Sequence, residues 1–151
     1  MREFELDDSD EPITLIINSA GGSVTNGFYI AQYLSQYKKP LNIIVPGMAA
    51  SMAGILLAGG GKNPNVTRYG FPASYILLHD GYVALESTES RTADDIMDFN
   101  KGVDNEIQEF IVANTNISRE EYNSHARKQW FIKSAEAVKL GLLDHIYGVD
   151  A

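Results

Sequence analysis

The sequence predicts an α/β protein built on a mostly parallel sheet. Three apolar runs of strand length, at residues 13–18, 41–45 and 75–78, contain no charged residue. Continuous apolar runs are typical of strands that are covered on both faces in a parallel sheet. Helical stretches separate the runs, and a strand–helix–strand order predicts right-handed crossovers. A length of 151 residues fits one domain with a sizeable core.

The composition narrows the classes of site and partner. The chain has no cysteine, which excludes a disulfide scaffold, a thiolate nucleophile and a cysteine metal site. Its three histidines, His79, His125 and His145, are far apart and lack metal-ligand spacing, so we expect neither a metal site nor a cofactor. A net charge of −8 argues against a nucleic-acid partner, since affinity for nucleic acid comes mainly from clustered Lys and Arg.

The ends and the hydropathy indicate a cytoplasmic protein with no membrane partner. No apolar stretch reaches the length of about 18 residues that a membrane span requires. The acidic start, MREFELDDSDE, is the opposite of the basic beginning of a signal peptide. We interpret residues 1–12 as an acidic amino-terminal arm and residues 13–151 as the domain.

The first apolar run ends at a glycine pair, Gly21 and Gly22. Glycine allows positive φ and lets another backbone or a ligand approach closely. A helix is expected from about Thr25 to Lys38, because residues 38–40 (Lys-Lys-Pro) supply a dipole-compensating end and a stop signal.

The second apolar run, 41–45, leads to a sharp corner at Ser51. Small residues flank this serine, Ala49 on one side and Ala53 on the other, and a buried helix to about Ala58 follows. A strand-to-helix turn with a projecting hydroxyl needs small flanks, as in the nucleophile elbow of serine hydrolases. A serine that opens a helix can also serve only as its cap.

The remaining elements follow from turn, cap and periodicity signals. An extended piece is expected at 66–69 and a strand at 75–78, ending at His79. A long helix is expected at 92–114, opened by a capping box at Thr92, with an apolar face at Ile96, Phe99, Val103, Ile107 and Phe110 or Ile111. The rest of the chain is expected to form a helix at 118–128 opened by Ser118, an extended piece at 130–132, a helix at 134–140 capped by Ser134, and a turn with a short strand at 142–147.

Candidate catalytic groups lie at the carboxyl ends of these strands, the edge where open α/β proteins place ligands. Acyl transfer by serine needs a base, an orienting group and donors for the oxyanion. Ser51 and His79 can supply the nucleophile and the base. The backbone N–H groups of Met52 and Gly22 can supply the oxyanion hole. The plainer alternatives are a surface histidine at a strand end and a glycine pair that only forms a tight turn.

Four segments resemble the proteolytic subunit of the Clp protease, and the resemblance extends from about Leu6 onward. They are INSAGGSVTNG (17–27), PGMAASMAG (46–54), LLHDG (77–81) and SAEAVKLGLLDHI (134–146). The resemblance implies a crotonase-like fold of stacked ββα units, with about 80–114 as a protruding handle. It also implies a serine endopeptidase that cuts unfolded polypeptides inside a homo-oligomer of stacked heptameric rings, fed by an ATP-driven unfoldase.

By motif match, Ser51 is the nucleophile, His79 the base, and the N–H groups of Gly22 and Met52 the oxyanion hole. The sequence departs from the family pattern at the third triad position. His125 stands where the family has its aspartate, and no aspartate occurs between residues 104 and 144. A lost orienting carboxylate lowers kcat by roughly 10⁴ in the serine-protease template.

Several readings therefore compete. The first is an active peptidase, either a weak dyad-like enzyme or one in which Glu121 has taken over as the acid. The second is a catalytically weak or inactive ring subunit with a structural role. The third is a crotonase-like acyl-CoA enzyme, which would need carboxylates near the oxyanion hole and basic residues for the nucleotide phosphates. The family also carries a further strand, helix and axial loops at its amino end, whereas this sequence begins just before its first core strand.

Overall fold

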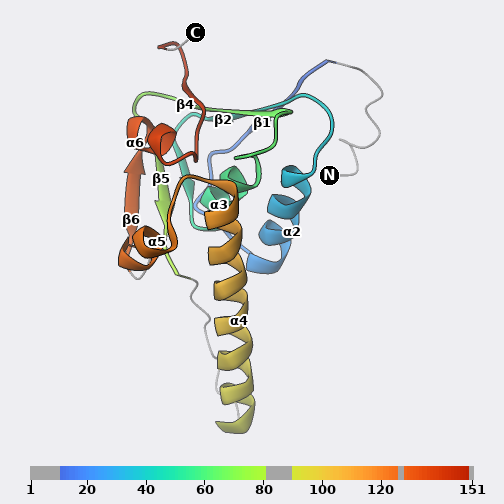
Figure 1. Cartoon of the computed structure of the whole chain (residues 1–151), viewed down its shortest axis with the longest axis vertical. Helices are drawn as coiled ribbons and strands as arrows, with labels where there is room; N and C mark the ends of the chain where they lie inside the picture. Colours follow the sequence, from blue (N-terminus) through green and yellow to red (C-terminus); the bar gives the residue numbers. More distant parts are fainter. Residues whose placement is uncertain (1–10, 81–89, 126–127, 150–151) are drawn as a thin grey trace.

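The computed structural model describes residues 11–80, 90–125 and 128–149, and it confirms an α/β fold with mostly parallel strands (Figure 1). The helices are α2 (Val24–Ser35), α3 (Met52–Gly59), α4 (Ser90–Asn114), α5 (Arg119–His125) and α6 (Ser134–Lys139). The strands are β1 (Ile13–Ile16), β2 (Leu41–Val45), β3 (Met48–Ala50), β4 (Val66–Gly70), β5 (Tyr75–Leu78), β6 (Trp130–Lys133) and β7 (His145–Ile146).

The strands form two sheets rather than the single sheet that the sequence suggested. One sheet has the order β1-β2-β4-β7 and is parallel throughout. The other has the order β3-β5-β6, with β3 parallel and β6 antiparallel to β5. The sequence analysis did not predict β3. Pro46 and Gly47 end the apolar strand pattern after β2, so the next three residues do not stand out as a strand. Beyond this break the chain leaves the first sheet and pairs with β5.

Small residues bring α2 and α3 into close contact beneath the four-stranded sheet (Figure 1). A Cβ atom at Gly59 would collide with the backbone of Ala31 on α2, and one at Gly27 would collide with the side chain of Met52. The packing therefore requires glycine at both positions. It fixes the first residue of α3, Met52, against the first turn of α2.

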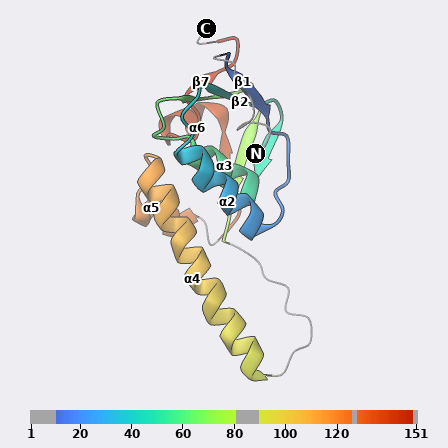
Figure 2. The same cartoon turned by 90° about the vertical axis from the view of Figure 1, so that its right-hand side faces the viewer.

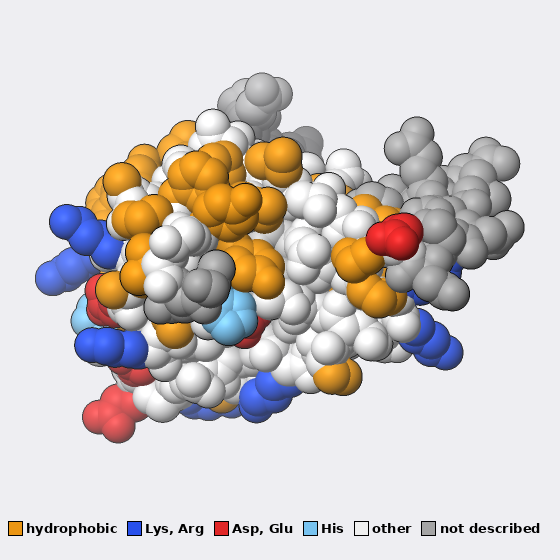
Figure 3. Space-filling view, turned by 90° about the horizontal axis from the view of Figure 1, so that it is seen from above, with side chains coloured by type: hydrophobic (Ala, Val, Ile, Leu, Met, Phe, Trp, Pro, Cys, Tyr) orange, Lys and Arg blue, Asp and Glu red, His pale blue; other side chains and the backbone are white. Residues whose placement is uncertain are grey.

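The outer face of the four-stranded sheet is left open by the helices, so the prediction that every apolar strand is covered on both faces was wrong for β1. Ile16 is 65 % exposed, and the ring of Phe71 stacks on that of Tyr147 with centroids 5.0 Å apart. Seen from above, hydrophobic side chains gather on one face of the molecule (Figure 3). This face is an apolar surface of the kind that binds other proteins.

The long helix α4 extends away from the rest of the protein (Figures 1 and 2). Its carboxyl-terminal part belongs to the core, since Ile107 and Ile111 are buried and Phe110 meets Phe28 edge-on at 5.3 Å. On the same apolar face but nearer its start, Phe99 is 71 % exposed. The periodic face predicted from the sequence exists, and only about half of it is buried within the described chain.

Two predicted helix ends were wrong. Helix α2 ends at Ser35 with no basic residue in its last turn, so Lys38 and Lys39 lie beyond it and do not compensate its dipole. Helix α4 begins at Ser90, two residues before the capping box expected at Thr92. Helix propensity in these segments does not define the ends to within two residues.

Of two predicted serine caps, one is confirmed. Ser118 caps α5, where its hydroxyl accepts a hydrogen bond from the N–H of Glu121 at 3.1 Å. Ser134 is instead the first residue of α6 and makes no cap. Its buried hydroxyl lies 2.7 Å from the carbonyl oxygen of Phe71 and 2.9 Å from that of Ser74. Ser134 thus ties α6 to the turn before β5.

A buried ion pair closes the domain. The side chain of Arg68 on β4 is 1 % exposed and binds both carboxylate oxygens of Asp144, at 3.0 and 2.7 Å. Its remaining nitrogen donates to the carbonyl oxygens of Leu57 and Gly141. One guanidinium therefore joins β4, α3 and the segment after α6, in a position that strand periodicity alone did not reveal.

Candidate active site

Ser51 occupies a strained elbow between β3 and α3. Its φ of 55° makes it the one non-glycine residue with positive φ among residues 11–80, 90–125 and 128–149. Such a conformation costs about 1–3 kcal/mol and persists where the surroundings over-determine it. Here the N–H of Ser51 donates to the carbonyl of Leu77 at 2.7 Å, and its own carbonyl accepts from Gly54 at 2.9 Å. This is the strand–turn–helix setting of a nucleophile elbow.

The alternative role of Ser51, as a helix cap, lacks its defining interaction. The Ser51 side chain makes no capping hydrogen bond to α3. The residue is also partly exposed, so a substrate can reach it. The hydroxyl is therefore available for chemistry rather than bound to the helix backbone.

The glycine corner after β1 lies directly against this elbow. A Cβ atom at Gly21 would lie 2.8 Å from both the carbonyl oxygen of Ala50 and the Cβ of Ser51, and 3.2 Å from the nitrogen of Met52. Gly21 also has φ of 109°, in the region that favours glycine. Two backbone hydrogen bonds between Ser19 and β3, of 3.0 and 2.9 Å, hold the corner in place. Glycine is required here for the contact as well as for the turn.

Both predicted oxyanion donors border one hollow of about 460 Å³. Gly22 follows the glycine corner, and Met52 is the first residue of α3, where N–H groups have no partner within the helix. Between them the surface of the hollow includes the side chains of Ala53 and Leu56. Gly22 and Met52 therefore line the same hollow, whose lining does not include Ser51.

His79 reaches the same region from the neighbouring strand. Strand β5 runs parallel to β3 with Leu77 opposite Ala50, so the residues that follow the two strands leave the same edge. The Nδ1 atom of His79 lies 2.5 Å from the carbonyl oxygen of Asp80. A carbonyl only accepts, so a hydrogen bond at this contact requires the tautomer that carries its proton on Nδ1. That tautomer is the one that a general base requires.

His125 is the last residue of α5, and its ring nitrogen Nδ1 is bonded within its own helix. Its Nδ1 is 2.9 Å from the carbonyl oxygen of Glu121 and 2.8 Å from the hydroxyl of Ser124. Its ring stacks on Trp130 with centroids 4.5 Å apart, and Trp130 is paired with Leu78, the residue before His79. Trp130 therefore links His125 to the strand that carries His79.

Sequence analysis did not identify Tyr122 as part of this region. Tyr122 is buried on α5, and burial raises the pKa of its hydroxyl above the usual range. The negative charges of Asp80 and Asp104 raise it further. Tyr122 is consequently neutral at ordinary pH. Asp80 directly follows His79, and Asp104 belongs to α4.

The residues that the structure describes were compared with the requirements of a metal site and of a membrane-spanning helix. Within them, no group of three or more His, Cys, Asp or Glu side chains is arranged to hold a metal ion. In the same residues, no helix combines the length and apolarity needed to cross a membrane.

Known proteins resemble the chain along nearly its whole length. The family model described as Clp protease matches residues 2–150. An ATP-dependent Clp protease proteolytic subunit of Cyanophora paradoxa is 31 % identical over 146 residues, covering 95 % of this chain and 72 % of the relative. ATP-dependent Clp protease proteolytic subunit 1 of Shouchella clausii (strain KSM-K16) is 31 % identical over 145 residues, covering 94 % and 72 %. The chain belongs to the Clp protease family, and membership supports a peptidase role.

The substitution Gly21→Ala tests the contact that positions Ser51. The added methyl group must displace the elbow, and a displacement of about 1 Å at a reacting atom can lower a rate by roughly 100-fold. The rate of Ser51 labelling by a fluorophosphonate, followed by mass spectrometry, measures the effect. Gly102→Ala on α4 is the matched control, because a Cβ atom there meets nothing within 4 Å. Equal labelling of the two variants would show that the elbow does not depend on Gly21.

Proposed function

We propose that this chain is a serine endopeptidase that hydrolyses peptide bonds of unfolded polypeptides, with Ser51 as nucleophile and His79 as general base. The observation that carries the proposal is the positive-φ elbow at Ser51, enclosed by the glycine corner and by β5. Strain at one serine, held by contacts from two other segments, is expected where a hydroxyl must project toward a substrate. Family membership supports the same reaction class.

In the proposed reaction, the Ser51 oxygen attacks the carbonyl carbon of the peptide bond. Its proton passes to Nε2 of His79, and the negative charge on the carbonyl oxygen is stabilised by the N–H groups of Gly22 and Met52. The C–N bond then breaks, and His79 returns the proton to the leaving amine. Water activated by His79 hydrolyses the resulting acyl-enzyme in the same manner and frees Ser51.

The proposed third member of the catalytic group is His125. Its position in the sequence matches that of the family aspartate, and its stacking on Trp130 keeps it beside the strand of His79. A neutral imidazole can fix the tautomer of His79 but cannot stabilise an imidazolium as a carboxylate does. We therefore propose a slow peptidase.

A non-catalytic ring subunit is the second candidate function, and His125 is the observation that favours it. The two candidates differ in the state of Ser51. An active peptidase has an activated serine that reacts with electrophiles, whereas a structural subunit keeps the fold and the assembly without that reactivity.

We propose that the chain works as a homo-oligomer of stacked heptameric rings, located in the cytoplasm. The exposed apolar residues at the start of α4, Phe99 and Met97, and the open outer face around Ile16 support assembly, because a small monomeric domain rarely leaves such surfaces uncovered. The names of both relatives include ATP dependence, which supports an ATP-driven unfoldase as partner.

The first test is labelling by a fluorophosphonate at neutral pH, together with cleavage of an unfolded protein substrate. We expect a single modified residue, Ser51, and loss of both labelling and cleavage in Ser51→Ala and in His79→Ala. Ser35→Ala, which removes a hydroxyl that bonds only to its own helix, is the control and should behave as the parent chain. A folded, assembled protein that is not labelled would favour the structural subunit.

The second test is His125→Asp, which restores the residue type of the family. A carboxylate at this position stabilises the imidazolium that forms on His79, so the labelling rate should rise at least tenfold, within the roughly 10⁴ that such a carboxylate contributes in the serine-protease template. Glu121→Gln is the companion variant and should leave the rate unchanged. A rate that falls in Glu121→Gln and does not rise in His125→Asp would transfer the orienting role to Glu121.

A further inference from the structure

The hydroxyl of Ser19 lies at the start of the glycine corner and holds the first of its two N–H groups. The N–H of Gly21 donates to the Oγ of Ser19 at 3.1 Å. In the part of the chain that the structure describes, the next N–H, that of Gly22, donates to no protein atom. One of two neighbouring donors is therefore occupied by a side chain, while the other remains available to a ligand.

Backbone hydrogen bonds fix the position of Ser19 itself. Its N–H donates to the carbonyl of Met48 at 3.0 Å, and its carbonyl accepts from the N–H of Ala50 at 2.9 Å. Ala50 directly precedes Ser51, so Ser19 belongs to a stretch of backbone that is tied to the elbow. The hydroxyl of Ser19 therefore holds the glycine corner at a fixed position relative to Ser51.

The same hydroxyl influences the direction of the second donor. The Oγ of Ser19 lies 3.5 Å from the carbonyl oxygen of Gly21, at the upper limit for a hydrogen bond. That carbonyl and the N–H of Gly22 belong to one peptide unit, which is planar and trans. The two groups point in opposite directions across a trans peptide bond, so the N–H of Gly22 points away from Ser19.

A pair of glycines needs such an anchor if it is to supply an oxyanion donor. With no Cβ atom, glycine has access to more backbone conformations than other residues, and Gly21 has φ of 109°. Stabilisation of an oxyanion depends on donors that are held in place before the reaction. The glycines permit the close approach to Ser51, but they do not by themselves fix the direction of an N–H group.

We propose that Ser19 is a positioning residue of the active site, whose hydroxyl holds the glycine corner so that the N–H of Gly22 serves as an oxyanion donor. The inference rests on the proposed function, because this donor has a role only if Ser51 performs acyl transfer. Ser19 acts through Gly22 and not on the substrate. Loss of its hydroxyl should therefore lower the rate of the reaction rather than the affinity for substrate.

Amide hydrogen exchange of the whole protein, resolved to single residues, tests the hydrogen bond without any reaction. Relative to an unstructured peptide, the N–H of Gly21 should exchange roughly fivefold or more slowly than that of Gly22. Ser19→Ala should remove this difference. Equal exchange of the two amides in the parent chain would overturn the proposal.

Kinetic measurements on Ser19→Ala then test the role of that hydrogen bond. Removal of one oxyanion donor lowers kcat by roughly 10²–10³-fold, so a misplaced donor should lower kcat and the labelling of Ser51 by about tenfold or more. KM should stay within about twofold of the parent value, because substrate binding does not use this donor. Acylation of His79 by diethyl pyrocarbonate needs no oxyanion hole and should keep the parent rate. Ser19→Thr retains a hydroxyl and should restore most of kcat.

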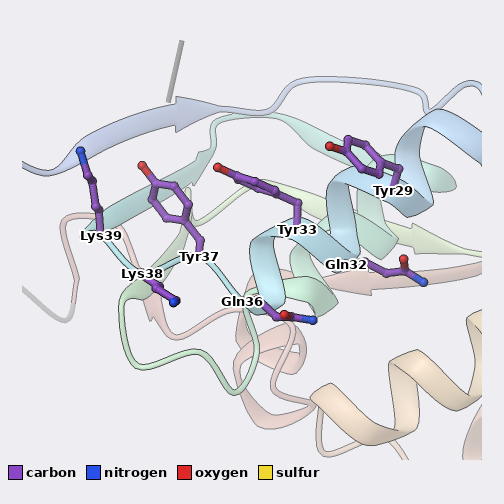
Figure 4. A pocket seen from close by; sticks show the side chains of 7 residues that line it. All are labelled: Tyr29, Gln32, Tyr33, Gln36, Tyr37, Lys38 and Lys39. Atoms are coloured by element: carbon purple, nitrogen blue, oxygen red, sulfur yellow. The ribbon is translucent and has the colours of Figure 1, made fainter. Parts of the chain in front are cut away.

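Tyr29→Phe is the control variant. It also removes one hydroxyl, from a groove along α2 (Figure 4) that shares no lining residue with the hollow that Gly22 lines. Tyr29 is 61 % exposed, so this change should leave kcat and the labelling of Ser51 at the parent values.

Two kinetic results would overturn the role of Ser19 alone. The first is a Ser19→Ala variant that is labelled, and turns over substrate, as fast as a labelled parent chain. The second is a Ser19→Thr variant as slow as Ser19→Ala, because the loss would then follow from the shape of the side chain and not from its hydroxyl. A folded parent chain that is never labelled at Ser51 would instead overturn the peptidase proposal, and with it the role of Gly22.

Discussion

The close approach of the Gly21 backbone to Ser51 is the constraint on which the candidate site depends. It holds only because no Cβ atom separates the corner after β1 from the elbow after β3. Gly22, the next residue, lines the same hollow as Met52, whose N–H has no partner within the helix. Three segments far apart in the sequence, ending at Gly22, Ser51 and His79, thereby meet at one place. The ladder between β3 and β5 places Ser51 and His79 just beyond the ends of neighbouring strands.

His125 stands where a carboxylate would orient His79, and this limits the reaction rate that the candidate site can reach. The Nδ1 atom of His79 lies beside the carbonyl oxygen of Asp80, which can accept a hydrogen bond but carries no charge to balance an imidazolium. Preorganised N–H donors contribute to acyl transfer independently of the triad. The rate of acyl transfer would then depend mainly on the elbow at Ser51 and on the proposed oxyanion hole. His125 would determine any further increase in that rate.

Sequence patterns predicted the strands of the core well, because β1, β2 and β5 are continuous apolar runs. They failed where the outcome depends on tertiary contacts. Nothing in the run Met-Ala-Ala identifies β3 as a strand, since its hydrogen bonds come from Ser19 and β5. The burial of Arg68 depends on Asp144, 76 residues away. The small residues that flank Ser51 did predict the elbow, whereas the positive φ of Ser51 is seen only in the structure.

The most direct measurement is a high-resolution structure of the protein after reaction with a fluorophosphonate. We predict a phosphonyl group bonded to the Oγ of Ser51, one of its oxygens accepting hydrogen bonds from the N–H groups of both Gly22 and Met52, and Nε2 of His79 within hydrogen-bond distance of Oγ. An adduct on Ser51 whose phosphonyl oxygen faces solvent, with both N–H groups bonded elsewhere, would contradict the account of how this site performs acyl transfer.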